Sequence, residues 1–447
     1  MNKLLNQSCA LGLALHLAVI VFCLSACSES SPAVASKMML GYSEADITPP
    51  LGTPLGGFGA PGGYRTATAV HDPILAQVAF FSNDLGQSFV IITLDSAGYS
   101  YDFGDWGPGI ADLRRSIAAE VADQLSLEPE HILVTSSHTH SGPDHVGFWQ
   151  TPHNGPAVEM LEEIITKVTM AAVQALANQV EVNLHFAHTE LAGYSKRDSD
   201  CSDVIDNSVE VLQAKTLANQ VIVTIANYAN HPTMMPESNT ELSADFVWGF
   251  RQEMQNQTSA PSMFIQGYIA AVHHKNVPSG DGVWDPAMNM GVLLAEAVIE
   301  ATFSQAKDFD ISHQWKLFSC VAEGAYVILA YRDFDVMKRY LDDDGTTVTV
   351  EQIEVSWHKL GPAEFAVMPG EPTAEISFAF KERMNSPYKF MVGLGNDSIG
   401  YLIDQASIDK DQSGQLSSYE LEMGLGRPGG QAAWDAMASL SWFDDTD

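Results

Sequence analysis

One stretch decides the fold of this chain: Ile132-Leu133-Val134-Thr135-Ser136-Ser137-His138-Thr139-His140-Ser141-Gly142-Pro143. Its β-branched apolar run predicts a buried strand, and the Gly-Pro pair predicts the turn that ends it. Residues two apart on an extended chain point the same way, so His138 and His140 could share one cation, or one could bind it while the other moves protons. The alternative to a metal or catalytic site is that both histidines are ordinary polar residues of a loop. Short motifs often match by chance, so this alternative stays open.

The segments around this strand alternate between strand and helix. Two apolar runs, Val78 to Phe81 and Phe89 to Leu94, are separated by a turn and predict a hairpin. Apolar residues recur at helical spacing from Ile110 to Leu125 and from Val158 to Ala177. This alternation predicts an α/β fold, a layered mixed sheet with flanking helices.

The same alternation continues toward the C-terminus. Strands are predicted at Val209 to Leu212, at Val221 to Ala226 and at Met263 to Val272. Helices are predicted at Phe246 to Gln255 and at Met288 to Phe303. From Trp315 onward, turn residues and short apolar runs predict a strand-rich C-terminal third.

Composition excludes one class of partner. The 447 residues carry 22 basic and 56 acidic side chains, a formal net charge of −34, which would repel nucleic acid phosphates. A hydrophobic content of 46% is that of an ordinary globular protein.

The N-terminus predicts export. Residues 1–26 combine Lys3 with a short apolar stretch, as a lipoprotein signal peptide does, and Leu24-Ser25-Ala26-Cys27 resembles the bacterial lipobox. Cys27 would then carry the lipid that holds the protein to a membrane. Residues 27–38 read as a flexible tether and residues 39–447 as the folded domain. We therefore expect an exported lipoprotein of the outer membrane or facing the periplasm.

Three predicted strands end in histidine, at His138 with His140, at His231, and at His273 with His274. Catalytic zinc takes three protein ligands, often including one carboxylate, and Glu371 follows a fourth apolar run at a Pro-Gly turn. An ordinary solvated turn glutamate is the alternative.

Short motifs occur in one order along the chain: Asp46-Ile47-Thr48-Pro49, His71-Asp72-Pro73, His138-Thr139-His140-Ser141-Gly142-Pro143, Asn230-His231-Pro232-Thr233, Ser243-Ala244-Asp245, Pro369-Gly370-Glu371, and Asn396-Asp397 with Gly400-Tyr401. Together they resemble the neutral/alkaline, non-lysosomal ceramidase family. The match spans about Met39 to Tyr401, nearly the whole mature chain, and the joint pattern is far more specific than any one motif.

The resemblance implies a zinc-dependent amidase that cleaves a linear amide bond, with N-acyl-sphingosine (ceramide) or a related N-acyl lipid as substrate. It implies that His138, His231, Glu371 and Tyr401 hold the zinc and that His140 assists proton transfer. Arg197, or its neighbour Lys196, would add positive charge over the oxyanion. Zinc lowers the pKa of bound water to about 7 and polarises the amide carbonyl.

One segment departs from the family pattern. Where the family has an acidic turn, this chain reads Ala270-Ala271-Val272-His273-His274. His273 could replace the missing groups in catalysis. The alternative is a noncatalytic, metal-stabilised surface lipoprotein that keeps the fold and binds a ligand. A metal-dependent phosphoesterase is a third reading, disfavoured by the acidic surface.

A second metal site is predicted near the C-terminus. Residues 409–420 match the twelve-residue EF-hand loop, with glycine at its sharp turn and glutamate at its end. An acidic surface loop is the alternative. The predicted Ca²⁺ ligands are Asp409, Asp411, Ser413, Gln415 and Glu420.

Two cysteines, Cys201 and Cys320, remain in the mature body. They could form one disulfide in an oxidising compartment or stay as buried thiols.

Overall fold

The computed structural model describes residues 35–62, 65–197, 202–410 and 418–440. The predicted signal peptide and Cys27 lie outside these ranges, as do Cys201 and the predicted calcium ligands Asp411, Ser413 and Gln415. Cys320 is a buried, free cysteine. Among the described helices, none combines the length and apolar character needed to cross a membrane.

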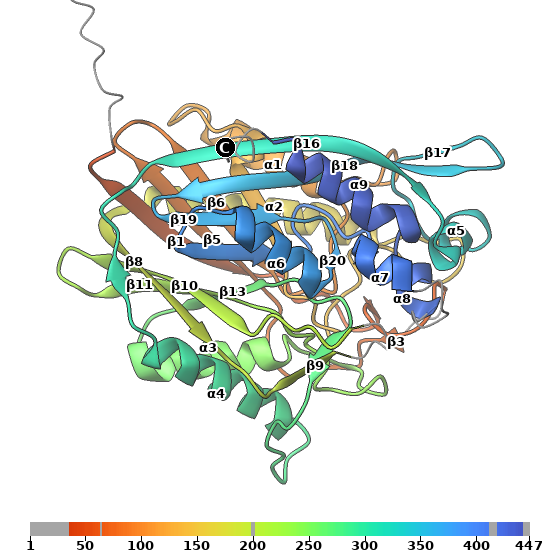
Figure 1. Ribbon diagram of the computed structural model, residues 1–447, viewed down its shortest axis with the longest axis horizontal. Helices are drawn as coiled ribbons and strands as arrows, with labels where there is room; N and C mark the ends of the chain where they lie inside the picture. Colours follow the sequence, from red (N-terminus) through yellow and green to blue (C-terminus); the bar gives the residue numbers. More distant parts are fainter. Residues whose placement is uncertain (1–34, 63–64, 198–201, 411–417, 441–447) are drawn as a thin grey trace, which may run out of the picture. The chain divides into compact units, whose positions relative to one another are not determined.

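The largest element is a nine-stranded mixed sheet in the order β13-β11-β10-β8-β1-β5-β6-β7, with β15 beside β8 (Figure 1). The pairs β6/β7 and β11/β13 are parallel, and the other pairs are antiparallel. The strands are β1 (Met38–Asp46), β5 (Leu75–Asn83), β6 (Ser88–Leu94), β7 (Ile132–Ser136), β8 (Val180–Glu190), β10 (Ser208–Thr216), β11 (Val221–Tyr228), β13 (Ser262–Gln266) and β15 (Ser304–Gln305).

The two ends of this sheet approach each other. Gln266, the last residue of β13, donates from Nε2 to the carbonyl of Ser137, which follows β7, at 2.8 Å. The loops beyond the strands also meet, because the His140 N–H donates to the carbonyl of Pro232 at 3.2 Å. The segments that follow β7 and β11 therefore lie side by side although they are far apart in sequence.

A smaller, five-stranded sheet has the order β16-β18-β19-β21, with β17 beside β18. It confirms the predicted strand-rich C-terminal third, although helices also occur there. Its strands are β16 (Ile311–Ala322), β17 (Leu341–Asp343), β18 (Val348–Leu360), β19 (Ala363–Val367) and β21 (Tyr388–Val392).

Alternate residues of the large sheet face different layers, as the period of two of a strand requires. On one face, Val78 and Phe80 pack against α1 (Ile110–Val121) and α2 (Val158–Ala177). On the other face, residues such as Phe81 pack against the smaller sheet.

Further helices complete the outer layers (Figure 1). Helices α3 (Phe246–Thr258) and α4 (Asp285–Glu300) pack on the large sheet over β10, β11 and β13. Helices α5 (Ala325–Arg332), α6 (Ala374–Arg383) and α9 (Arg427–Ala438) cover the outer face of the smaller sheet. The layers are helix, sheet, sheet and helix, so the predicted layered α/β fold is confirmed.

One predicted strand is wrong in its extent. The strand expected from Met263 to Val272 ends at Gln266, and a separate short strand β14 (Val272–His274) pairs with β9 (Ser195–Arg197). Between them Ala271 has a φ of 54°, a left-handed conformation that a strand does not contain. The apolar residues of this segment are buried, but they lie in a loop. Apolar content alone does not distinguish a buried loop from a buried strand.

The Asn396-Asp397 motif joins the two sheets. Asn396 accepts a hydrogen bond from the Val134 N–H of β7 at 2.9 Å and donates to the Glu354 carboxylate of β18 at 2.8 Å. Glu354 in turn pairs with Arg114 at 2.7 Å, and both side chains are buried. Asp397 forms a bidentate pair with Arg339, at 3.0 and 2.8 Å. These contacts fix the loop that leads to Tyr401.

Candidate metal centre

His138 follows β7 at the point where the chain turns sharply. Its φ is 66°, an uncommon value for a residue with a side chain, and its N–H is held by the carbonyl of Ser96 at 2.9 Å. The imidazole Nδ1 lies 2.5 Å from the carbonyl oxygen of Ala97. Because a carbonyl can only accept, Nδ1 carries the proton and Nε2 presents a lone pair.

His231 follows β11 and is oriented in the same way. Its Nδ1 lies 2.7 Å from the carbonyl oxygen of Val272, which also accepts the His231 N–H at 3.2 Å. Its Nε2 is therefore also free of a proton. A backbone carbonyl on the other ring nitrogen is the usual support of a metal-ligating histidine.

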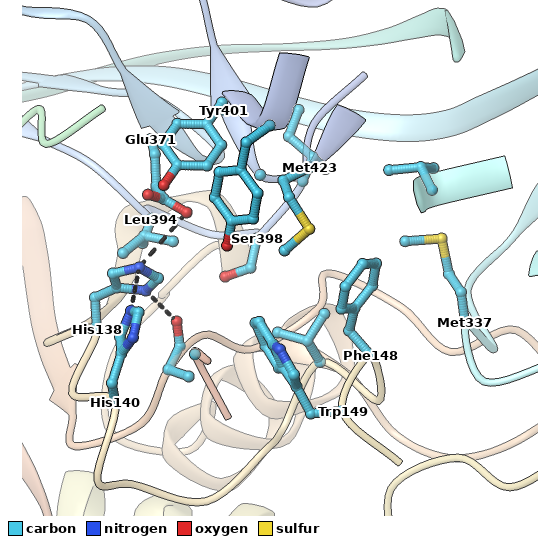
Figure 2. A pocket seen from close by; sticks show the side chains of 17 residues that line it. His138, His140, Phe148, Trp149, Met337, Glu371, Leu394, Ser398, Tyr401 and Met423 are labelled. Carbon is cyan, nitrogen blue, oxygen red and sulfur yellow. Dashed lines mark hydrogen bonds and ion pairs between the residues drawn. The ribbon is translucent and has the colours of Figure 1, made fainter. Parts of the chain in front are cut away.

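Glu371 completes this arrangement from the segment that follows strand β19 of the smaller sheet (Figure 2). It opens the short strand β20 (Glu371–Pro372) just after β19, and its carboxylate is buried. One carboxylate oxygen lies 3.5 Å from Nε2 of His138. The other lies 3.2 Å from Nε2 of His231. The structure thus brings together His138, His231 and Glu371, three of the four residues predicted to hold the metal.

His140 lies within reach of the same point. Its Nε2 is 3.2 Å from Nε2 of His138, and its Nδ1 is buried with no hydrogen-bond partner among the described residues. The ligand atoms of His138, His140 and His231 all lie within 4.8 Å of one another. His140 can therefore ligate a cation or stand beside it.

The pKa shifts favour the ligating forms. Burial lowers the pKa of His138, and burial together with the neighbouring histidines lowers the pKa of His140 well below its ordinary value. Burial would raise the pKa of Glu371, but His138 and His231 outweigh this effect and lower it. Neutral imidazoles and an ionised carboxylate are the forms that bind metals.

The donor set fits a divalent transition metal. Imidazole nitrogens and a carboxylate are the ligands that zinc takes in catalytic sites. His138 and His231 both use Nδ1 on carbonyls, so each turns the lone pair of Nε2 toward the Glu371 carboxylate, and a cation between these acceptors would remove their repulsion. A buried His138, His140 and His231 group could therefore hold a metal.

Tyr401 lies beside Glu371 because β20 pairs in parallel with β22 (Tyr401–Leu402), which sets these two residues opposite each other. Figure 2 shows Tyr401, Glu371 and His138 on the same side of a cavity. Burial, with Glu371 nearby, raises the pKa of Tyr401 well above its ordinary value. Tyr401 therefore lies close enough to Glu371 to be the fourth metal ligand that the resemblance implies.

Two predicted catalytic residues lie on the β9/β14 pair. His273 stacks on His231 with ring centroids 4.7 Å apart, so it restrains the orientation of that ring. The guanidinium of Arg197 is instead paired with Glu375 at 2.6 Å and is almost fully buried. This ion pair offsets its charge, which weakens the expectation that Arg197 stabilises an oxyanion.

The predicted calcium loop begins in helix α7 (Gln405–Lys410) and ends in helix α8 (Ser418–Glu422). Asp409 accepts a side-chain hydrogen bond from Gln405. Glu420 is buried and lines a cavity with His231 and His273. Since most of the loop lies outside the described residues, the calcium site stays a prediction, but Glu420 occupies a place that the motif did not predict.

Two cavities flank the metal centre and share Gly57, His140, Tyr401 and Tyr419. The first, here called the apolar cavity, has an empty volume of about 600 Å³, part of it open to solvent. Besides the metal centre it is lined by Val146, Phe148, Trp149, Val327, Met337 and Met423 (Figure 2). Phe148 and Trp149 line this cavity and also belong to the buried hydrophobic core, whereas Trp106 lines a different cavity.

The second, here called the polar cavity, has an empty volume of about 770 Å³, also partly open to solvent. Its distinguishing members are His231, Thr233, Ala271, His273 and Glu420. An extended molecule held at the metal can therefore reach both an apolar and a polar environment.

Gly57 is a site residue that the sequence did not single out. Its φ is 97°, and an added Cβ would lie 2.3 Å from Cγ of His140. We expect Gly57→Ala to displace the His140 ring and lower kcat/KM for an amide substrate by about 100-fold, because small misplacements in a site have effects of this size. Steady-state kinetics measure the change.

Gly59→Ala is the matched control. Gly59 also has a positive φ, 89°, but its added Cβ would meet nothing closer than 3.9 Å. It carries the same backbone strain without the contact to His140. Equal losses in the two variants would contradict the steric explanation.

No protein-family model matches the chain, and no curated protein matches its sequence. Solved structures do share its fold. Neutral ceramidase from Pseudomonas aeruginosa superposes with a TM-score of 0.72 at 14% identity, covering 92% of this chain and 75% of that chain. A ceramidase complexed with C2 gives a TM-score of 0.71 at 14% identity, covering 91% and 75%. The predicted resemblance to neutral ceramidases is confirmed for the fold.

Proposed function

We propose that this protein is a zinc-dependent hydrolase of a linear amide bond in an N-acyl lipid, of which N-acyl-sphingosine (ceramide) is one example. The observation that carries the proposal is the convergence of His138, His231 and Glu371, with both imidazoles held through Nδ1 by backbone carbonyls. Three protein ligands that leave a position open for water are typical of catalytic zinc sites.

Each residue of the centre has a task in this reaction. Zinc, when bound, supplies an activated water and polarises the amide carbonyl. His138, His231 and Glu371 would hold it, and Tyr401 stands beside Glu371. His140 would take and return a proton at Nε2, and burial with the neighbouring histidines lowers its pKa, so the ring is neutral before the reaction. His273 keeps the ring of His231 in place by stacking.

The apolar cavity supports an acyl substrate. Aromatic and methionine side chains line it from several loops, and an acyl chain would be removed from water there. An N-acyl lipid also agrees with the predicted lipid anchor at Cys27, which would keep the enzyme beside a membrane.

A noncatalytic binding protein remains the second candidate, favoured by the divergent segment from Ala270 to His274. This segment keeps a supporting role, because the carbonyl of Val272 orients His231. A protein that only bound ligand would keep this support too, so turnover must decide.

The test is metal content together with turnover. We expect the purified protein to contain about one zinc per chain, as a single catalytic site requires, and to hydrolyse a fluorogenic N-acyl amide. A chelator should abolish hydrolysis, and added zinc should restore it. A protein with full zinc and no turnover on a panel of amides and esters would support the binding protein instead.

A further inference from the structure

Arg65 lies outside the predicted metal ligands, yet it holds the backbone around His140. It opens the two-residue strand β3 (Arg65–Thr66). Its Nη2 donates to the carbonyl of His140 at 2.7 Å and to the carbonyl of Gly56 at 3.0 Å. Its Nη1 donates to the carbonyl of Asn239 at 2.7 Å. One guanidinium therefore joins three separate segments of the backbone.

These three segments lie around the His140 ring. Gly56 precedes Gly57, whose missing side chain leaves room for that ring, since an added Cβ would lie 2.3 Å from its Cγ. Asn239 donates from Nδ2 to the hydroxyl of Ser141, the residue after His140, at 2.9 Å. The guanidinium thus fixes the backbone that carries the ring, a segment that packs against the ring and a segment that holds the next residue.

Phe58 links the guanidinium to the same ring by packing. Cζ of Arg65 lies 4.9 Å from the centroid of the Phe58 ring, which is a cation–π contact. The Phe58 ring meets the His140 ring in a T-shaped arrangement, with centroids 4.6 Å apart. A change at Arg65 therefore reaches His140 through an aromatic contact as well as through the backbone.

His140 depends on this packing more than the other two histidines of the centre do. Nδ1 of His138 and Nδ1 of His231 are each held by a backbone carbonyl, at 2.5 and 2.7 Å. A bond of this kind normally fixes the orientation of such a ring. Nδ1 of His140 is shielded from solvent and has no hydrogen-bond partner among the described residues. Among protein groups, the ring is therefore oriented by its packed neighbours and by the backbone that the guanidinium holds.

Arginine suits this task better than any other side chain. Its guanidinium presents five N–H donors in one rigid plane and stays charged. Hydrogen bonds from a charged donor are shorter and stronger than those between neutral groups. Lysine carries the same charge on a flexible stem without the planar fork, and methionine carries neither the charge nor a donor. Two nitrogens that reach three carbonyls therefore use both the charge and the fork.

We propose that Arg65 is a positioning residue that sets the orientation of the His140 imidazole at the metal centre. Arg65 lines neither the apolar nor the polar cavity, so it acts on the reaction through His140. Its effect on turnover rests on the proposed amide hydrolysis, whereas its effect on the ring does not.

Arg65→Met in the zinc-loaded full chain tests this role. We expect kcat for a fluorogenic N-acyl amide to fall about 100-fold, because small misplacements in a site have effects of this size. KM and zinc content should stay nearly as in the wild type, since the apolar cavity and the other metal ligands keep their supports. Arg65→Lys keeps the charge without the fork, should lower kcat about tenfold, and replaces Arg65→Met if that variant does not fold. Unchanged kcat in both variants would overturn the proposal.

A double-mutant cycle shows whether Arg65 acts through His140. When His140→Ala is already present, adding Arg65→Met should change kcat by less than about twofold, because residues that act as a unit are not additive. Two losses that multiply would overturn the proposal, since Arg65 would then affect turnover without His140.

Arg115→Met is the matched control. Arg115 lies on α1, is largely exposed and pairs with Asp112 on the same helix. The substitution removes the same guanidinium from a site away from both cavities. It should leave kcat, KM and zinc content as in the wild type, and an equal loss in Arg115→Met and Arg65→Met would contradict the assigned role.

The proposed function and the role of Arg65 can fail separately. A crystal structure of Arg65→Met shows the His140 ring without any need for turnover. We expect the ring to turn or shift, so that the 3.2 Å approach of its Nε2 to Nε2 of His138 is lost. An unmoved ring would refute the role of Arg65 even if the wild type hydrolyses amides. A displaced ring in a protein that hydrolyses no amide would uphold that role and contradict only the hydrolase.

Discussion

Replacing His138 by alanine is expected to empty the metal centre and abolish amide hydrolysis. His138 is the predicted ligand that both His140 and Glu371 approach, at 3.2 and 3.5 Å from its Nε2. Changes to residues that only support a metal ligand cost about 10- to 100-fold in affinity, so loss of a ligand itself should cost more than about 100-fold. Zinc content and turnover of a fluorogenic N-acyl amide measure the two effects.

His140→Ala separates ligation from proton transfer. If His140 only moves protons, this variant keeps its zinc and loses about 10²- to 10⁴-fold in turnover, the usual contribution of a positioned acid or base. If it loses zinc as His138→Ala does, His140 is a ligand, which its place within 4.8 Å of the other ligand atoms also permits. Full zinc and unchanged turnover in His138→Ala would refute the centre altogether.

Replacing Asp397 by alanine is expected to lower the free energy of unfolding by about 3 to 5 kcal/mol, the usual cost of removing one partner of a buried ion pair. Arg339 and Asp397 are both buried and form two hydrogen bonds to each other. Asp397 also accepts the N–H groups of Tyr101 and Ser398. Urea unfolding followed by circular dichroism measures the loss.

Asp343→Ala provides the comparison. Asp343 pairs with Arg332 at 2.6 Å in a solvated position, where ion pairs contribute little because water and salt screen them. Replacing both Arg339 and Asp397 by apolar residues should recover part of the stability, since no unpaired charge then remains buried. If Asp397→Ala unfolded at the same urea concentration as Asp343→Ala, the buried pair of Arg339 and Asp397 would contribute no more to the free energy of unfolding than the solvated pair.

The sequence predicted which residues meet at the candidate metal centre better than it predicted the residues around them. Apolar runs that end in histidine correctly predicted that β7 and β11 deliver His138 and His231 to one place, which lies where the two ends of the large sheet meet. The short motif at Glu371 predicted a carboxylate there. Apolar content also predicted the bounds of α2 without error. These features depend on local pattern, which one chain displays directly.

What the sequence did not predict depends on distant contacts. Gly57 matters because its missing side chain leaves room for His140, and no local pattern shows this. Glu420 matched a calcium loop by spacing, yet it faces the polar cavity. Arg197 was predicted to face the substrate, but its partner Glu375 lies far along the chain. Long-range pairing of this kind is visible only in the folded protein.

The meeting of the two ends of the large sheet has a consequence for how the protein assembles. Donors from β7, β11 and the smaller sheet come together only after long loops have closed, so the ion cannot find its complete ligand set in a partly folded chain. A cation bound there would stabilise the contacts between these distant segments of the chain. The more fully the site is occupied, the more slowly amide hydrogens should exchange where Ser137 and Gln266 join the two ends of the sheet. Protection from exchange at this contact would therefore follow metal binding as the last step of folding.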